Sequence, residues 1–464
     1  MDPYYRKQVL MKFLFHAACL AIALISVNGY AQDTPPLSLP ELWSQALSNY
    51  PSLEAYRAQY REAEVNEKAI RFEKVPELSL QLQNTVATQN AVSGSFFPLP
   101  GVYNVNGDGI NLTNNMFGSA VLDWAFLQFG KQKKSQQAAA ILTHQAKQRL
   151  DIEQLKIQTA LSREYFDFSF NDAMVEWARI NTERLEAILK VARSKAEAGL
   201  VPGADSLLIK ATLDQARSEL HSRRGRLEES RIVLSRWVNA TPNQLSIQAP
   251  PRPNVAVVSL QSTENTAVSH PQLELAIDQV RYAEKQRELS RVQGLPDVSL
   301  LAGLQLRGMS PERESLFDAS VEHNYQTVHN YAIGIGVTWN LTNVFRSGLK
   351  ARRYQEQVRQ MESTHDEIAL ALRTQEAYAR EQLAEIARQI KSADESYSAA
   401  EQAYALFEAR YNSGLMSITE LLQIQDLVQK TDRARIEAYY QYWLQQVNLA
   451  EATADFSWLQ ENLQ

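Results

Sequence analysis

Four segments of this chain alternate regularly between apolar and polar side chains. A sustained period of two predicts half-buried β-strands. The segments form two pairs, within about 76–126 and about 296–342, and long polar loops at about 90–109 and 308–329 separate the partners. The apolar positions expected to share a face are Leu78, Leu80 and Leu82; Ala120, Leu122, Trp124 and Phe126; Val298, Leu300, Ala302, Leu304 and Leu306; and Tyr331, Ile333, Ile335, Val337, Trp339 and Leu341.

Each pair is preceded by a helical pattern, at about 40–75 and about 271–294, and followed by a very long one. Lys131–Ala198 and Leu349–Ser413 contain no glycine or proline, which predicts helices of 68 and 65 residues. At ~1.5 Å per residue such helices are about 100 Å long. Apolar or small residues recur along both in alternating steps of three and four, as in helices that coil around a partner. The predicted seam positions are Phe168, Asn171, Val175, Ala178, Thr182, Leu185, Leu189, Ala192 and Ala196, and then Leu383, Ile386, Ile390, Ala393, Tyr397, Ala400, Tyr404, Phe407 and Tyr411.

The same landmarks occur twice and in the same order, which indicates a tandem duplication. The matched landmarks are Pro51 and Pro271, Pro76 and Pro296, Trp124 and Trp339, and Gly199 and Gly414. We divide the chain into a signal peptide at 1–31, a first repeat at 32–265 and a second repeat at 266–464. Each repeat is expected to contain a helix, a strand pair and a long helical hairpin, at about 130–239 in the first and about 345–462 in the second.

The four predicted strands are too few to close a barrel, because about eight are needed to surround filled side chains. If they span a membrane, several copies of the chain must combine their strands, since only helices and closed barrels satisfy the backbone in lipid. Trp124 and Trp339 would then lie where strands return to the periplasmic side, in an aromatic belt at the membrane interface. The alternation by itself also fits a soluble hairpin with one face on a core.

The N-terminus has the pattern of a secretory signal. Basic residues precede an apolar run at 17–27, and the small residues at 29–31 suit cleavage. The run is too short to span a bilayer. Removal of 1–31 takes away Cys19, the single cysteine, so the mature chain is expected to lack disulfides and thiol chemistry. A net charge of −6 for the whole sequence gives no indication of a nucleic-acid partner.

The sequence offers little for catalysis. Its histidines are scattered without metal-ligand spacing, and Gly107-x-Gly109 and Gly334-x-Gly336 lack the third glycine of a nucleotide-binding loop. We therefore expect no enzymatic activity, no cofactor and no metal site.

The turns between the long helices are the best candidates for function. Gly199 and Gly414 fit the position just after a helix, where the backbone is often left-handed. Each is followed by a leucine, Leu200 or Leu415, and an exposed apolar side chain at two matched tips suggests a docking partner. Helix capping by Ser417 or Thr419 explains most of the remaining pattern without any function.

Taken together, the helix starts at Pro51 and Pro271, the Pro-x-Leu/Val-Ser-Leu strand starts and the Gly-Leu tips resemble the outer-membrane efflux protein family typified by TolC. The resemblance covers about 39–463. It implies a mainly α-helical protein with a membrane β-barrel, in which three copies form a twelve-stranded outer-membrane barrel and a periplasmic α-barrel. Residues from about Asn239 to Val268 would form an equatorial segment. The implied partners are two further copies, outer-membrane lipid, a periplasmic adaptor that contacts Gly199, Leu200, Gly414 and Leu415, and an inner-membrane pump of the RND, ABC or MFS type.

The resemblance also implies a periplasmic gate. Glu420 falls at an acidic position of the family's constriction, Tyr411 matches the tyrosine of its latch, and Asp205 matches the acidic partner. The next acidic position of the family is Gln423 here, and Met416 stands where the best-known member has an arginine. The closed-state ion pairs of that member are therefore not all present in this sequence.

Two other kinds of protein also use long helical hairpins. A periplasmic adaptor would contain one hairpin flanked by split β segments, whereas this chain has two hairpins and repeated strand pairs. A structural coiled-coil envelope protein would not require matched hairpins. The exported substrate and the class of pump are left open by the sequence.

Overall fold

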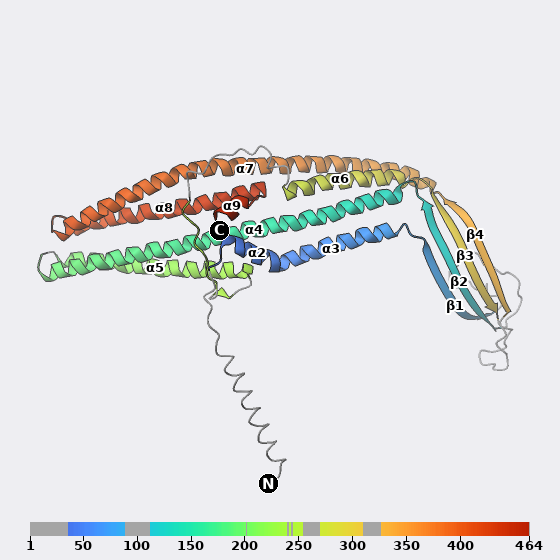
Figure 1. Ribbon diagram of the computed structural model, residues 1–464, viewed down its shortest axis with the longest axis horizontal. Coiled ribbons are helices and arrows are strands. Elements are labelled where there is room, and N and C mark those ends of the chain that lie inside the picture. The colour runs from blue at the N-terminus through green and yellow to red at the C-terminus, as the bar shows by residue number, and fades with distance from the viewer. Residues whose placement is uncertain are drawn as a thin grey trace, which may run out of the picture.

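The computed structural model describes residues 36–88, 112–200, 202–238, 241–242, 245–253, 270–309 and 326–463. A curved sheet lies at one end of the molecule, and long helices extend away from it to two hairpin tips at the other end (Figure 1). The predicted signal peptide at 1–31, the loop at 90–109, most of the loop at 308–329 and much of the segment at 239–268 fall outside the described residues.

The sheet has four antiparallel strands in the order β1-β2-β3-β4. Their bounds are β1 Glu77–Thr88, β2 Leu112–Leu127, β3 Asp297–Met309 and β4 Gln326–Thr338. The predicted strands are confirmed except at one end. Trp339 and Leu341 were expected to continue the fourth strand, but β4 ends at Thr338 and Leu341 is the first residue of a helix. The side chain of Asn340 accepts a hydrogen bond from the Asn343 N–H, 3.3 Å away, and so caps that helix instead.

The strand register separates apolar from polar residues on the two faces of the sheet. Residues directly opposite each other in an antiparallel pair lie on the same face. One row across the four strands consists of Leu80, Ala120, Leu304 and Tyr331. The adjacent row, on the other face, consists of Gln81, Ser119, Gln305 and Asn330. The apolar face is exposed, and Tyr331 reaches 87% exposure.

Two helical hairpins make up most of the length. The first consists of α4 (Lys131–Glu197, 67 residues) and α5 (Gly203–Val238), and the second of α7 (Leu341–Asn412, 72 residues) and α8 (Ile418–Thr453). Helix α7 begins earlier than the expected Leu349 and accommodates Gly348 within its first turns. All the predicted seam positions are buried or half-buried. Among the described residues, no helix is both long and apolar enough to cross a membrane.

The shorter helices are α2 (Leu39–Asn49), α3 (Pro51–Phe72), α6 (Pro271–Val292) and α9 (Ser457–Asn462). The helical stretch expected over about 40–75 consists of two helices, because Tyr50 is extended, with ψ 126°, and a new helix starts at Pro51, as the sequence predicted. A residue before proline is sterically kept out of the α conformation. The second hairpin, expected to reach 462, ends at Thr453 because Ala454 turns left-handed at φ 54°.

The main hydrophobic core lies midway along the helices, where α2 and α9 pack against the two hairpins (Figure 1). It is rich in aromatic residues. Phe166 stacks on Trp443 with ring centroids 5.2 Å apart, and Trp43 meets Phe456 edge-on at 5.2 Å. A second cluster of mostly aliphatic residues lies nearer the tips. The long hairpins are therefore held at their middle and at their far end.

Candidate functional site

The first hairpin tip follows directly from its glycine. At the end of α4 the N–H of Leu200 donates to the carbonyl of Lys195 at 2.9 Å, and the N–H of Gly199 donates to that of Ala196 at 3.0 Å. These two bonds define a Schellman motif, which needs a left-handed residue just after the helix. Gly199 supplies it with φ +70°, a conformation in which a side chain is strained.

The second tip repeats this arrangement. The N–H of Leu415 donates to the carbonyl of Arg410 at 2.9 Å, the N–H of Gly414 donates to that of Tyr411 at 3.0 Å, and Gly414 has φ +76°. The structure thus places both glycines where the sequence predicted them.

Both tip leucines point away from the protein. Leu200 is 74% exposed and Leu415 is 72% exposed. Because each follows a rigid Schellman turn, the two side chains are presented in the same local geometry. Two exposed apolar side chains in matched positions form a small contact surface at the end of the molecule.

Glu420 serves the start of α8. Its carboxylate accepts hydrogen bonds from the Ser417 hydroxyl at 2.7 Å and the Ser417 N–H at 3.0 Å, while the Ser417 hydroxyl caps the N–H of Glu420. This is a capping box. The hydrogen bonds from Ser417 lower the pKa of the exposed Glu420 carboxyl, so it is ionised at neutral pH. Gln423 is exposed one turn further along α8.

Arg410 contributes a positive charge near this carboxylate. Its charge also lowers the pKa of Glu420, after the hydrogen bonds from Ser417. The resemblance places the arginine of the best-known family member at Met416 and gives no role to Arg410, which lies in the last turn of α7. Within the described ranges, no three His, Cys, Asp or Glu side chains come together in a way that suits a metal ion.

Tyr411 is buried between the two tips, with 3% exposure. The ammonium group of Lys195 donates a hydrogen bond to its carbonyl and lies 4.2 Å from the centre of its ring. Burial, and secondarily the negative charge of Asp205, raise the pKa of the Tyr411 hydroxyl. That hydroxyl has no hydrogen-bond partner among the described residues. Sequence reasoning missed Lys195, although a basic residue in the last turn of a helix is a common feature.

The two predicted belt tryptophans make equivalent hydrogen bonds at the junction between sheet and helices. The Trp124 indole N–H donates to the carbonyl of Lys74 at 3.1 Å, and the Trp339 indole N–H donates to that of Gly294 at 3.0 Å. Each acceptor lies in the turn that leads from a helix into a strand. Trp124 is 37% exposed and Trp339 is 54% exposed. Each tryptophan therefore fixes a corner of the chain and still presents ring surface outward.

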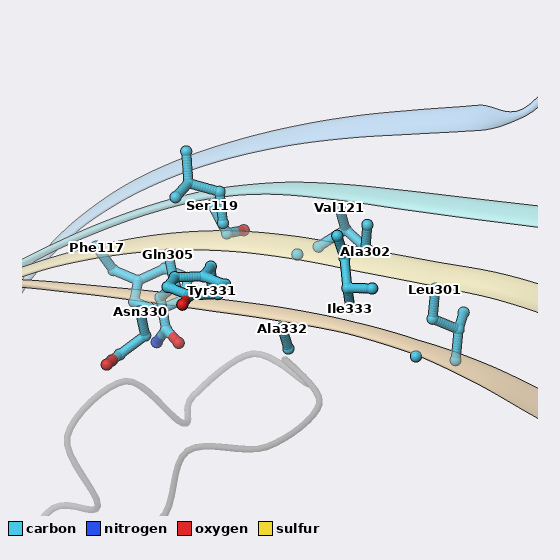
Figure 2. A pocket seen from close by; sticks show the side chains of 13 residues that line it. Phe117, Ser119, Val121, Leu301, Ala302, Gln305, Asn330, Tyr331, Ala332 and Ile333 are labelled. Atoms are coloured by element: carbon cyan, nitrogen blue, oxygen red, sulfur yellow. The ribbon is translucent and has the colours of Figure 1, made fainter.

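The polar face of the sheet carries a hollow of about 500 Å³ (Figure 2). Its lining comes from β2, β3 and β4 and includes Phe117, Gln305 and Asn330. Small residues such as Gly303 and Ala332 are also part of the lining. Most of its lining residues belong to the face opposite the apolar one, whereas Ala302, Leu304, Tyr331 and Ile333 belong to the apolar face.

Two helical hairpins, each with one helix about 100 Å long, joined to an edge-open sheet with one apolar face, are the arrangement of an outer-membrane channel subunit. The model of the outer membrane efflux protein family matches residues 42–240 and 263–455, and the chain belongs to this family. It is an outer-membrane protein whose helices extend into the periplasm. No curated protein sequence gives a significant match.

Solved structures of channels have the same fold. The outer-membrane channel OprN is 16% identical, with a TM-score of 0.72 and 89% of each chain covered. The outer membrane protein VceC from Vibrio cholerae is 18% identical, with a TM-score of 0.70, and the match covers 90% of this chain and 96% of VceC. The CmeC outer membrane channel of Campylobacter jejuni is 14% identical, with a TM-score of 0.70 and coverage of 92% and 89%. The family and these neighbours are channels.

Proposed function

We propose that three copies of this chain form the exit duct of a tripartite efflux or type I secretion system. The duct conducts substrates passively from an inner-membrane pump and a periplasmic adaptor to the outside. It performs no catalysis of its own. The energy for transport comes from the pump, whether of the RND, ABC or MFS type.

The observation that carries this proposal is the sheet. Its outer strands β1 and β4 each have one unpaired edge within the described part of the chain, and one of its faces is apolar and exposed. An exposed apolar sheet with free edges is unstable in water and prone to pair with other strands. Three such sheets joined edge to edge give twelve strands, enough for a barrel with lipid outside and the polar face inside.

The tips are the proposed meeting point with the adaptor. Gly199 and Gly414 fix the two turns, and Leu200 and Leu415 present the apolar contacts. The division into a first repeat at 32–265 and a second at 266–464 gives each protomer two tips, so a trimer presents six. In the membrane, Trp124 and Trp339 form the periplasmic aromatic belt.

The proposed gate lies just beside the tips. Three copies of Glu420 around a threefold axis form a ring of negative charge, and rings of acidic side chains favour cations in other pores. Gln423 continues this lining without charge. Tyr411 and Asp205 belong to the contact between the two hairpins that must loosen when the entrance widens.

The test is single-channel conductance of purified trimers in planar bilayers with a salt gradient. Glu420→Gln removes the charge but keeps the capping box, because glutamine also fits its third position. Ser417→Ala weakens the cap but keeps the charge. We expect the Glu420→Gln channel to lose cation preference and the Ser417→Ala channel to retain it.

Each outcome has a separate meaning. Unchanged ion preference in Glu420→Gln would show that Glu420 does not line the constriction. Purified protein that is monomeric and passes no ions would contradict the duct itself.

A periplasmic adaptor is the main alternative. It is disfavoured because the family model matches both halves of the chain and because each half contributes a strand pair and a hairpin. Co-purification of an adaptor with the wild-type trimer, reduced when Leu200 and Leu415 are both changed to Asp, would support the duct. Equal recovery of the adaptor with the wild-type trimer and with the double Asp variant would rule out docking through the tip leucines.

A further inference from the structure

The two β-hairpins of the chain are equivalent residue by residue. Leu82 lies opposite Gly118 in the first, and Ala302 lies opposite Ile333 in the second. Every residue pair between β1 and β2 thus corresponds to a residue pair between β3 and β4. The residue number increases by 220 from β1 to β3 (302 minus 82) and by 215 from β2 to β4 (333 minus 118). The same shift of 215 relates Gly199 to Gly414 and keeps α4 and α7 in register along their length.

The first repeat meets the second through one set of contacts. Strand β2 pairs with β3, with Leu122 opposite Ala302, and α4 packs against α6. At the corner, the Lys131 ammonium group donates to the Leu295 carbonyl at 2.8 Å and to the Asp297 carboxylate at 2.7 Å. The contact therefore has a defined register and a specific ion pair.

The residues equivalent to this contact are exposed at the two outer edges of the protomer. The counterpart of Lys131 is Arg346, and the counterpart of Asp297 is Glu77. Both are exposed, and neither has a charged or hydrogen-bonding partner among the described residues. The two repeats thus carry the same charge signs at equivalent positions, but only one of the two possible pairs forms within a chain.

Helix packing has the same asymmetry. Helix α4 packs against α3, α5, α6 and α8, whereas the main partners of α7 among the described elements are α6 and α8. Leu155 of α4 is 7% exposed, while its counterpart on α7, Leu370, is 66% exposed. The second repeat provides α6 and α8 as neighbours for α4. Within one chain, no further repeat provides the corresponding neighbours for α7.

We propose that a second copy of this chain completes these contacts with the register of the internal ones. Strand β4 pairs antiparallel with β1 of the next copy, with Val337 opposite the partner subunit's Leu82. Arg346 binds the partner subunit's Glu77, as Lys131 binds Asp297 within the chain. The proposal rests on the proposed trimer but goes further, because three copies and twelve strands do not by themselves specify the strand register between subunits.

The register can be tested with cysteine pairs, since the predicted mature chain contains no cysteine. Directly opposed residues in an antiparallel pair lie about 4.5–5.5 Å apart at Cβ, close enough for oxidative cross-linking. Val337→Cys with Leu82→Cys should give covalent dimers and trimers on denaturing gels. Val337→Cys with Leu80→Cys, displaced by two residues on the same face, should give several-fold less, and Leu122→Cys with Ala302→Cys should cross-link within one chain without changing its size.

The outcomes separate the two proposals. Stronger cross-linking of Val337→Cys with Leu80→Cys would overturn the register but leave the trimer intact. Failure of both intersubunit pairs, with normal cross-linking of the internal pair in a protein that migrates as a monomer, would overturn the trimer itself.

The ion pair needs its own measurement. Glu77→Arg should lower the yield of the Val337–Leu82 cross-link and the temperature at which trimers dissociate in detergent, because it places two cations together at each subunit contact. Adding Arg346→Glu should restore both. A double variant no better than Glu77→Arg alone would overturn the assigned pair, and intact trimers in Glu77→Arg alone would do the same.

Discussion

The middle of the helical region and its tips are packed by different means. The middle core is built from stacked and edge-on aromatic rings and includes α2 and α9, which come from the two ends of the described chain. The cluster near the tips has only two aromatic side chains among its buried members, Tyr404 and Tyr411, and the rest are aliphatic. Among its described residues, this second cluster contains no stacked or edge-on ring pair.

This difference indicates where the molecule resists motion and where it yields. Aromatic side chains bury 150–250 Å² each and dominate core energetics. Small seam residues let the helices approach closely, but each buries less apolar surface than an aromatic side chain. Separating the helices near the tips therefore costs less free energy than separating them at the middle core. The proposed opening at the periplasmic entrance agrees with this difference in packing, because it requires the tips to separate while the middle core stays packed.

The largest expected effect follows from removing one ring of the middle core. Phe166 is 1% exposed and contacts both Trp443 and Tyr165. We expect Phe166→Ala to lower the free energy of unfolding by about 3–5 kcal/mol. The measurement is urea or thermal unfolding of the solubilised protein, followed by helical circular dichroism.

The matched variant is Phe407→Ala in the tip cluster, where the ring is only half-buried. We expect Phe407→Ala to lower the free energy of unfolding by clearly less than Phe166→Ala does. Equal losses for the two variants would remove the proposed distinction between middle and tips.

The sequence predicted the parts of this comparison that depend on local pattern. The seam, the strands and the left-handed Gly199 and Gly414 each follow from a spacing or from a residue type that only one conformation suits. The contact of Lys195 with Tyr411 joins residues 216 positions apart, so no local pattern reveals it. The break at Tyr50 also follows from a local signal, because the proline after it keeps Tyr50 out of the α conformation and marks a helix start at Pro51.

The role of the tip residues in docking and gating is still a prediction, since their geometry alone does not identify a partner. Leu200 and Leu415 were correctly expected to be exposed. Glu420 was assigned by resemblance to a constriction, and the structure adds that it also stabilises the start of α8. Capping and gating both place a carboxylate at a helix N-terminus, which is why the sequence could not separate them.

A smaller effect is expected at the second tip from Gly414→Ala. An added Cβ would meet no atom within 4 Å, so the cost comes from the left-handed backbone alone, about 1–2 kcal/mol. Hydrogen exchange should accelerate in the last turn of α7 and the first turn of α8 and stay unchanged around Trp443. Gly203→Ala, also in open space but without a positive φ, is the control and should not accelerate exchange. Faster exchange in the middle core would mean that tip and middle do not open independently.

The smallest effect concerns pH at the border of the middle core. His270 caps α6: its Nδ1 accepts the Gln272 N–H at 3.2 Å, and its Nε2, taken as protonated, donates to the Glu451 carbonyl at 3.2 Å. Burial lowers the pKa of His270 from its ordinary 6.5, and the opposing attraction to Glu451 is weaker. The unfolded chain therefore binds a proton at higher pH than the folded one, so this part of the stability is complete above the ordinary pKa and declines as the pH falls below it.

Protonation would remove the acceptor at Nδ1 and with it a cap worth about 1 kcal/mol. We expect the wild-type melting temperature to fall between about pH 7.5 and about pH 5.5 by more than that of His270→Asn, which keeps a capping side chain but does not titrate in this range. The difference between the two slopes isolates His270 from every other titrating group. Parallel slopes would show that the middle core is insensitive to this proton, and hydrogen exchange at the tips should in either case be the same in the two proteins.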